Sequence, residues 1–519
     1  MEVSEGIDYA RFYSTSMKQF AELPDVDIAP KGTILVISPW NFPCAIPIGG
    51  IVAGLAGGNT VILKPATVAA PVAWLFAKAF WDAGVPKEAL QVIITDREAL
   101  KVLTTAPAVK HIILTGGTDT AQNIARSNPA TPLSAETGGK NAIILTASGD
   151  RDHAIMNIVA SAFGNAGQKC SACSLLLVER SVYEDKNFQD KLKDAATSMK
   201  VGSVWNPGNV VGPMITNKND KLLKALELEK GESWLVPPRF LDKHKYVLAP
   251  TVKWGVRPGN YSFRTELFGP MLSVVCIENL QQGIDLVNSL EYGLTSGLQS
   301  LDEGEQKLWK DSIMAGNLYI NRGITGAIVN RQPFGGMKLS AFGGGVKAGG
   351  PNYCACFVNI ADKPGSTTDY TQSYVKAYEQ EFAHARDVNN LYGEQNAFRY
   401  LPLKNMVLRL FPGDNNEDAK MIALAARICH TPLSISFEPG DDRTAALASL
   451  GCPLKEEALA GFLKSMKNYE RIRTCGADIP MEMYEEAARI DKYIATAKPV
   501  KDGRVESVSY THLRAHETC

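Results

Sequence analysis

The chain has 519 residues, with 54 lysines and arginines against 55 aspartates and glutamates, which gives a formal net charge of −1. Hydrophobic residues make up 45% and charged residues 21%, an ordinary balance for a globular protein. Because positive and negative residues balance, the composition does not indicate a basic surface for nucleic acid or an anionic membrane, so we expect neither as a partner. The longest apolar stretch, residues 46–58, is rich in glycine and too short to cross a bilayer.

Ten cysteines are scattered along the chain, and the N-terminus is acidic and amphipathic, unlike a secretory signal. This usage predicts reduced thiols and a cytoplasmic location. Residues 1–23 carry apolar side chains near helical spacing and are predicted to form one amphipathic helix. Because a domain rarely opens on such a helix, we expect that a preceding part of the first domain is missing.

Apolar runs alternate with helical segments through the first part of the chain. This alternation predicts a parallel α/β sheet with right-handed crossovers. The small residues of segment 46–56 are expected to let that helix pack tightly on the sheet. The predicted strands cover residues 32–38, 60–64, 90–95, 111–115, 132–136 and 141–145, and the predicted helices cover 46–56, 70–83 and 119–127.

Three of these strands end in segments suited to ligand binding, because ligands in such sheets lie beyond the carboxyl ends of the strands. The ends are Ser38-Pro39-Trp40, Lys64-Pro65-Ala66 and Thr115-Gly116-Gly117. One nucleotide-sized ligand would contact all three. The chain has no GxGxxG sequence, so the ordinary dinucleotide fingerprint does not apply.

A second α/β block begins near residue 150, and a third follows a linker at residues 362–371. The glycine-rich stretch 333–350 is expected to line a ligand site. The third block shows no catalytic constellation, and residues 507–519 match nothing before them, so we expect a foreign or misread tail. Further predicted strands cover residues 174–178, 272–277, 293–298, 316–321, 406–411 and 433–437, with helices at 154–164, 183–199, 417–429 and 455–469.

The stretch Phe163–Ser174, FGNAGQKCSACS, is the most distinctive of the chain. Its glycines allow a turn that presents Cys170 at a site instead of burying it in a core. Glu136 precedes two glycines in ETGGKN, and Asn41 lies within the rigid loop PWNFP. A thiol, a carboxylate and an amide donor are the minimum set for covalent catalysis on a carbonyl.

Each of these residues also has an ordinary structural interpretation. An isolated cysteine is usually a buried small hydrophobe, such a glutamate a solvated charge, and such an asparagine a turn former. The presence of all three in glycine-rich surroundings favours catalysis. The alternative is a zinc or redox site at residues 170–173, but this lone CxxC has no partner pair at zinc spacing, so we expect no metal.

The motifs PWNFP, LKPA, LTGG, ETGGKN, GQKCSA, ELFGP and QPFGG follow the order found in the aldehyde dehydrogenase superfamily, which residues 1–360 resemble. The segments INRGITGA (320–327) and KAGGP (347–351) are similar to its L-glutamate γ-semialdehyde (1-pyrroline-5-carboxylate) dehydrogenases. They most resemble the corresponding part of a bifunctional proline-catabolic enzyme. The region after Tyr370 resembles the extra C-terminal domain of the longer versions of that enzyme.

The resemblance implies an aldehyde-dehydrogenase-like α/β fold. It combines a Rossmann-type cofactor domain, an α/β catalytic domain and an additional C-terminal α/β unit. It also implies a homo-oligomer, and a proline dehydrogenase fused to the full-length parent. The implied boundaries are 1–146 for an N-terminally truncated NAD-binding domain, 147–345 for the catalytic domain, 346–369 for a return segment and linker, 370–506 for the C-terminal domain and 507–519 for a non-native tail.

By resemblance, the reaction oxidises L-glutamate γ-semialdehyde to L-glutamate, the second step of proline degradation, through a thiohemiacetal and a thioester. Cys170 attacks the aldehyde carbon as a thiolate, and Lys169 and a helix terminus are expected to lower its pKa. Asn41 and the Cys170 N–H hold the oxyanion, and hydride passes to NAD. Glu136 activates the water that hydrolyses the thioester.

The resemblance also assigns binding residues. At Thr67 the family often has an acidic ribose ligand, so NADP is not excluded beside NAD. A different small aldehyde as substrate, or an inactive structural fragment, are the alternatives. The residues implied to bind the cofactor are Ser38, Pro39, Trp40, Lys64, Ala66, Thr67, Gly116, Gly117, Thr118, Glu266 and Phe268, and those implied to bind the substrate are Phe42, Ser171, Gly326, Ala327 and Phe334.

Overall fold

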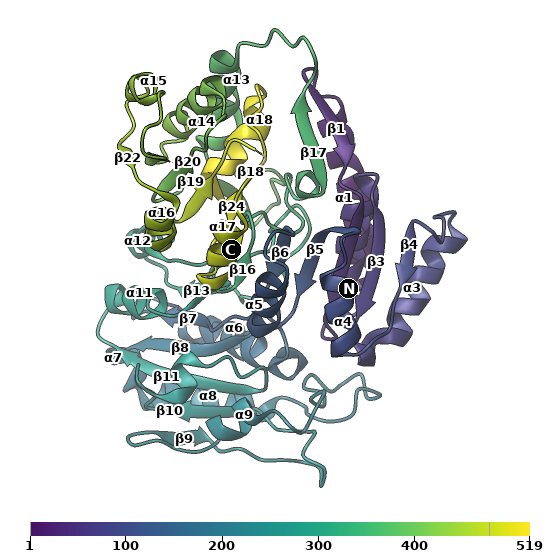
Figure 1. Ribbon diagram of the computed structural model, residues 1–519. Coiled ribbons are helices and arrows are strands. Elements are labelled where there is room, and N and C mark those ends of the chain that lie inside the picture. The colour runs from purple at the N-terminus through teal and green to yellow at the C-terminus, as the bar shows by residue number, and fades with distance from the viewer. Residues whose placement is uncertain (1, 477, 519) are drawn as a thin grey trace.

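The computed structural model describes residues 2–476 and 478–518. Figure 1 shows a first sheet at the right, a second below it and a C-terminal unit, in green to yellow, at the upper left. Parallel strands connected by helices dominate each part. The predicted α/β fold class is therefore confirmed.

The first sheet has the strand order β16-β6-β5-β2-β3-β4. All neighbours are parallel except β16, which adds antiparallel to β6. Since the earliest strand, β2, lies in the middle, the order reverses between β2 and β5, where ligands bind in open α/β sheets. The strands are β2 (Thr33–Ser38), β3 (Thr60–Pro65), β4 (Leu90–Val92), β5 (Val109–Thr115), β6 (Leu133–Glu136) and β16 (Ala341–Phe342).

Glycines bring helix α2 (Ala45–Ala56) close to this sheet. A Cβ at Gly50 would lie 2.9 Å from the Val36 side chain, and one at Gly54 would lie 2.7 Å from Val61. A side chain at either position would push the helix away from the strands, so the small residues act as predicted. The other helices of this part are α1 (Glu2–Ala21), α3 (Ala70–Asp82), α4 (Arg97–Thr104) and α5 (Thr118–Ser127).

The second sheet has the order β18-β19-β25-β14-β13-β7-β8-β11-β10-β9. Its strands from β25 to β10 are parallel, and antiparallel strands flank them. The strands are β7 (Asn141–Leu145), β8 (Cys173–Glu179), β9 (Ser233–Val236), β10 (Thr251–Trp254), β11 (Met271–Ile277), β13 (Thr295–Gln299), β14 (Asn317–Ile320), β18 (Arg386–Asp387), β19 (Gln395–Pro402) and β25 (Thr511–Thr518).

Two details of this sheet differ from the predictions. β7, which was expected to close the cofactor domain, pairs with β8 and β13, so the chain changes sheets at residues 137–140, before the predicted boundary at 146. The helix predicted for residues 183–199 is broken, because Asp185 caps a new helix. The helices here are α6 (Arg151–Phe163), α7 (Arg180–Tyr183), α8 (Lys186–Ser198), α9 (Asp220–Ala225), α10 (Tyr261–Arg264), α11 (Leu280–Asn288) and α12 (Glu303–Ser312).

A two-stranded ribbon stands apart from both sheets at the upper right of Figure 1. It pairs β1 (Val26–Pro30) with β17 (Val358–Asp362) in antiparallel register. Neither strand was predicted. A smaller antiparallel pair joins β12 (Tyr292–Gly293) to β15 (Met337–Lys338).

The C-terminal unit has a sheet of five parallel strands in the order β22-β21-β20-β23-β24. This is the same chain order as β4-β3-β2-β5-β6 of the first sheet, with the earliest strand in the middle. The helix predicted for residues 455–469 was wrong at its start, since those residues open with a strand. Arg443 bridges the loops after β20 and β21, where it donates to the Phe411 and Asp414 carbonyls and pairs with Asp441. The elements are α13 (Tyr370–Ala377), β20 (Met406–Arg409), α14 (Asn416–Ile428), β21 (Leu433–Phe437), α15 (Thr444–Ala448), β22 (Leu454–Glu456), α16 (Leu459–Ser465), β23 (Arg471–Arg473), α17 (Met481–Arg489), β24 (Ile494–Ala495) and α18 (Gly503–Glu506).

The terminal strand β25 lies between β14 and β19 in the second sheet. Interior strands of parallel sheets are usually apolar, but this one buries Arg514, His516 and Glu517. The Nε of Arg514 and the Nδ1 of His516 are buried without a hydrogen-bond partner among the described residues. The segment thus has a place in the fold, while its non-native origin stays a prediction.

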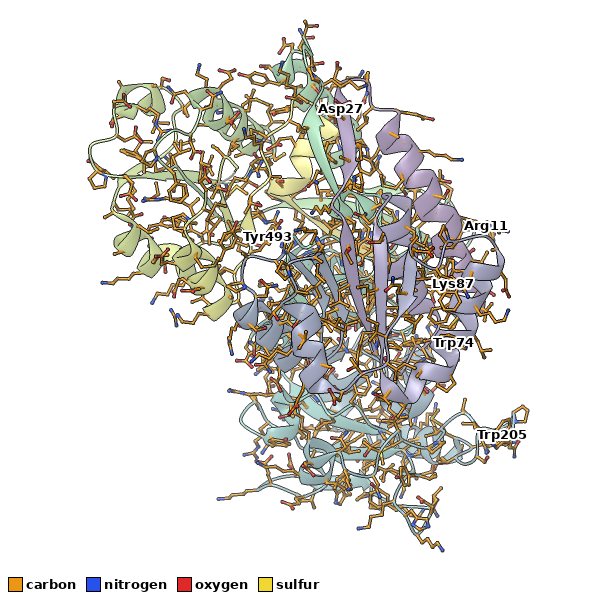
Figure 2. The ribbon with its side chains drawn as sticks, turned by 45° about the vertical axis from the view of Figure 1, so that its right-hand side comes forward. Arg11, Asp27, Trp74, Lys87, Trp205 and Tyr493 are labelled. Atoms are coloured by element: carbon orange, nitrogen blue, oxygen red, sulfur yellow. The ribbon has the colours of Figure 1, made fainter. Side chains whose placement is uncertain are left out.

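The molecular surface carries a few large apolar side chains. Trp74 is exposed on α3, and Trp205, 92% exposed, projects from a loop at the edge of the molecule in Figure 2. Within the described ranges, none of the helices combines the length and apolar character needed to cross a bilayer.

Asn59 links three segments of the first part through buried hydrogen bonds. Its Oδ1 accepts from the Gly32 N–H at 2.9 Å, and its Nδ2 donates to the Gly54 and Phe357 carbonyls, both at 2.9 Å. We expect Asn59→Ala to lower the free energy of unfolding by about 2 kcal/mol, because the buried Gly54 and Phe357 carbonyls each lose a donor and the Gly32 N–H loses its acceptor. Urea unfolding followed by circular dichroism measures this, and Asn416→Ala, at an exposed asparagine of α14, serves as the control. Equal stability of both variants would contradict the expectation.

Candidate active site

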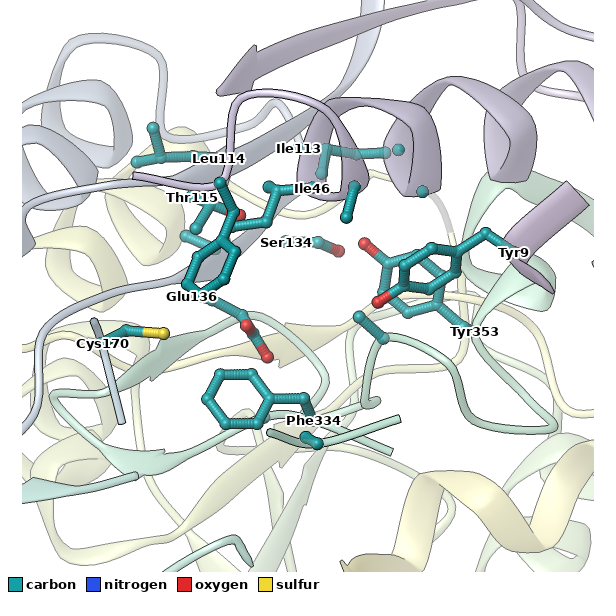
Figure 3. Close-up of a pocket in the computed structure, with 18 of the residues that line it drawn as sticks. Tyr9, Ile46, Ile113, Leu114, Thr115, Ser134, Glu136, Cys170, Phe334 and Tyr353 are labelled. Carbon is teal, nitrogen blue, oxygen red and sulfur yellow. The ribbon is translucent and has the colours of Figure 1, made fainter. Parts of the chain in front are cut away.

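A cavity of about 480 Å³ lies between the first sheet, the Cys170 loop and the glycine-rich stretch 333–350. Figure 3 shows Cys170, Glu136 and Phe334 around it, with Tyr9 and Tyr353 at its other end. Both predicted reacting groups thus face one space. The predicted catalytic and substrate residues that line it are Cys170, Glu136, Phe42, Ser171, Gly326, Ala327 and Phe334.

The loop before Cys170 has a constrained backbone. Helix α6 ends at Phe163, and Asn165 and Ala166 then adopt positive φ values of 56° and 52°. Gly167 follows with φ of 66°, and a Cβ there would strike the carbonyl oxygen of Gly269. This position therefore requires glycine both for its conformation and for its space. The turn predicted from the glycines is the one that brings Cys170 to the cavity.

Asn141 fixes the other side of this loop, and the sequence analysis assigned it no role. At the start of β7, its Nδ2 donates to the Cys170 carbonyl at 2.6 Å and to the Ala172 carbonyl at 3.1 Å. Its Oδ1 accepts from the Thr295 N–H at 3.0 Å. Asn141 ends the ETGGKN motif that begins at Glu136. This position was the sequence signal that the Glu136 motif and the Cys170 motif lie together in the structure.

Burial, and to a smaller extent the nearby carboxylates of Glu136 and Glu266, raise the pKa of the Cys170 thiol to about 12. The backbone N–H groups of Ser171 and of Cys170 itself act in the opposite direction. We expected Lys169 and a helix terminus to lower this pKa. That expectation was wrong, because the pKa of Cys170 is raised overall. Loss of hydration outweighs the local favourable groups, so the resting side chain is a thiol.

Glu136 ends β6, and its carboxyl group is oriented into the cavity in Figure 3. Burial raises its pKa to about 8, and Lys347 acts against this rise. A Cβ at Gly335 would lie 2.9 Å from Glu136 Oε1 and 3.0 Å from Lys347 Cγ, so the glycine leaves room for both side chains. Lys347 is itself buried, and its Nζ donates to Asn317 Oδ1 at 3.1 Å and to the Gly335 carbonyl. Lys347 was not predicted as a site residue from the sequence.

Asn41 lies outside the lining of the cavity but contacts the catalytic loop. Its Nδ2 donates to the Gln168 carbonyl at 3.2 Å. Gln168 is held in turn, because its Oε1 accepts from the Ile215 N–H at 2.8 Å. One of the two amide hydrogens of Asn41 is therefore bound to the backbone of Gln168, which lies two residues before Cys170.

The residues assigned to the cofactor lie at the carboxyl ends of β2, β3 and β5, outside the lining of the cavity. Ser38 Oγ, at the end of β2, is buried without a hydrogen-bond partner among the described residues. Gly117 is the N-cap of α5 and has no side chain to occupy the helix terminus. An unpaired hydroxyl and an open helix N-terminus fit a phosphate-bearing dinucleotide. The members of this group are Ser38, Pro39, Trp40, Lys64, Ala66, Thr67, Gly116, Gly117 and Thr118.

Glu266 and Phe268 approach the same edge from the second sheet. The rings of Trp40 and Phe268 meet edge to face, with centroids 5.7 Å apart. Glu266 Oε1 accepts from the Gly139 N–H at 2.8 Å, and burial raises the pKa of this carboxyl group. These contacts close one end of the crevice between the two sheets.

The sequence matches the model of the Aldehyde dehydrogenase family over residues 1–362. The 1-pyrroline-5-carboxylate dehydrogenase of Geobacillus sp. (strain WCH70) is 34% identical over 373 residues, which cover 68% of this chain and 72% of that protein.

Two solved structures extend the similarity to the fold. Proline utilization A (PutA) from Corynebacterium freiburgense has a TM-score of 0.87 and 36% identity, over 100% of this chain and 53% of that chain. The chain thus spans about half the length of this relative. The 1-pyrroline-5-carboxylate dehydrogenase from Thermus with bound NAD has a TM-score of 0.65 and 32% identity, over 70% of this chain and 73% of that chain. The fold, the site and the family match agree, and the chain belongs to the aldehyde dehydrogenase family.

Proposed function

We propose that this protein oxidises L-glutamate γ-semialdehyde, the open form of 1-pyrroline-5-carboxylate, to L-glutamate with NAD. The observation that carries this proposal is one cavity lined by Cys170, Glu136 and the turn at Gly326–Ala327. The first two residues supply aldehyde oxidation through a thioester. The backbone N–H groups of a glycine turn suit a carboxylate at the far end of the substrate. The names of the relatives support the same substrate.

In the first half of the reaction, the Cys170 sulfur attacks the aldehyde carbon and forms a thiohemiacetal. The thiol proton is released to solvent, and Glu136, whose raised pKa makes its carboxylate a competent base near neutral pH, is kept for the hydrolytic step. The free N–H of the Asn41 amide and the Cys170 backbone N–H stabilise the oxyanion. Each such donor is worth roughly 3 kcal/mol in acyl-transfer sites.

NAD, when bound, supplies the acceptor for the hydride that leaves the thiohemiacetal. Ser38, Lys64 and the start of α5 at Gly117 would hold its adenosine and pyrophosphate parts, and Glu266 and Phe268 its nicotinamide ribose. Thr67 in place of an acidic residue leaves NADP as an alternative, since no carboxylate at this position repels a 2′-phosphate.

In the second half, Glu136 takes a proton from water, which attacks the thioester and releases the carboxylic acid product. Phe42 and Phe334 flank the aliphatic chain of the substrate, and Ser171 with the turn at Gly326–Ala327 receives its carboxylate. A homo-oligomer, a cytoplasmic location and a proline dehydrogenase fused to a longer parent are further proposals. The last is supported by the length and name of the PutA relative.

Substrate preference tests the proposed function. We expect NADH formation to favour L-glutamate γ-semialdehyde over pentanal by at least about tenfold in kcat/KM, because hydrogen bonds to a carboxylate are strong. Cys170→Ala should remove more than about 99.9% of the activity. Cys173→Ala is the matched control, since this neighbouring buried cysteine does not line the cavity. Turnover that survives Cys170→Ala, or an absence of preference, would refute the assignment.

The role of Glu136 predicts a trapped intermediate. With Glu136→Gln we expect turnover to fall roughly a hundred- to ten-thousand-fold, because the hydrolytic step loses its base. The acyl group should then accumulate on Cys170 and be seen by intact-protein mass spectrometry. Loss of activity without such an adduct would place Glu136 in a different step.

The Glu136–Lys347 pair predicts a pH dependence. The base must be ionised, so the hydrolytic rate should rise with pH and be half-maximal near pH 8. Lys347→Met removes the cation that opposes the raised pKa of Glu136, so the rise should move to higher pH. Lys338→Met, at a lysine whose Nζ instead donates to the Asn288 and Leu290 carbonyls, is the control. A shift of the Lys347→Met profile to lower pH would contradict this account.

A further inference from the structure

The turn that carries Gly326 and Ala327 is supported by a segment far along the chain. Asn389 Nδ2 donates to the Asn330 carbonyl at 2.9 Å. Glu394 forms an ion pair with Arg331, and both of these side chains are largely buried, at 18% and 28% exposure. We call residues 326–332 the turn segment. Two of its consecutive residues, Asn330 and Arg331, are therefore contacted by side chains of the loop between β18 and β19.

The turn segment is also held by the buried side chain of Gln332, whose Nε2 donates to Asn396 Oδ1 at 3.3 Å, and by its own backbone. Arg331 N–H and Gln332 N–H both donate to the Ile328 carbonyl, at 3.1 and 2.9 Å, which closes the turn on itself. Asn330 N–H donates to the Gly349 carbonyl at 3.0 Å, and Asn330 has a positive φ of 60°. Gly326 has φ of 94°, and a Cβ there would meet no atom within 4 Å. Since the space beside Gly326 is open, the contacts at residues 330 and 331 restrain the position of the turn.

The supporting segment is closed by hydrogen bonds of its own. Asp387, in β18, accepts from the N–H groups of Asn389 and Asn390 through Oδ1, both at 3.0 Å. Its Oδ2 accepts from the Asn396 N–H at 2.9 Å. β18 and β19 pair in antiparallel register on either side of these residues. Asn389 and Glu394 are therefore presented by a loop whose backbone is closed by Asp387 and by the pairing of β18 with β19.

We propose that Asn389 and Glu394 are positioning residues that fix the carboxylate-binding turn and so set the affinity for the carboxylated substrate. This inference rests on the proposed function, because it needs the turn to receive a carboxylate. A small displacement of such backbone donors is costly to binding, since hydrogen bonds depend steeply on geometry. Neither residue lines the cavity, so neither is expected to act on the aldehyde carbon.

The test uses the full chain with Asn389→Ala and Glu394→Gln. Two aldehydes of equal chain length are compared, namely glutarate semialdehyde, which has the carboxylate, and pentanal, which lacks it. We expect each variant to raise KM for glutarate semialdehyde about three- to fivefold with unchanged kcat. KM and kcat for pentanal should stay at wild-type values. Glu486→Gln, at an exposed ion pair with Arg489 on α17, is the matched control and should change neither.

The outcomes separate this inference from the proposed function. If the wild type does not prefer the carboxylated aldehyde, the proposed function and the inference both fail. If the wild type shows the preference and both variants keep its KM, the inference alone fails. Equal losses on both aldehydes would also overturn it, because a pair with only a structural role would behave in that way. Activity on pentanal shows in the same experiment that each variant is folded.

Discussion

The hydrogen bonds of the Asn141 side chain join the two halves of the chemistry. Asn141 begins β7 directly after the ETGGK stretch that carries Glu136, and its amide holds the carbonyl groups of Cys170 and Ala172. The same side chain accepts from Thr295, so it also fixes the neighbouring strand β13. Nucleophile and base therefore share one rigid connection, although they belong to different sheets.

Loss of hydration dominates the electrostatics of this site. Burial is the largest cause of the raised pKa of Cys170 and Glu136 and of the lowered pKa of Lys347. Water removed from the cavity strengthens every remaining charge interaction, which is why one ammonium group near Glu136 has an effect. Burial in such a site disfavours the ionised forms of Cys170 and Glu136, so both groups ionise at a higher pH than they would in water.

Local patterns predicted much of the first sheet. The apolar runs at β2, β3 and β5 marked strands, and the motifs correctly placed Cys170 and Glu136 at one cavity. The failures have a common cause, because they depend on contacts between distant residues. The strands β1 and β17 pair with each other although more than 300 residues separate them in the sequence. Lys347 likewise approaches Glu136 only because the glycine-rich loop folds back. Spacing alone also gives no measure of burial, so the direction of the Cys170 pKa was missed.

The ribbon of β1 and β17 has a consequence for assembly. As a two-stranded pair within the described chain, it leaves one edge of each strand without a neighbour. Asp27 stands on the β1 strand at the top of Figure 2, and Pro30 ends that strand with no N–H to donate. A charge and a proline restrict which strands can add to an open edge. A strand that added to β1 would therefore meet a charge at Asp27 and lose one hydrogen-bond donor at Pro30, which makes unspecific pairing at this edge less favourable.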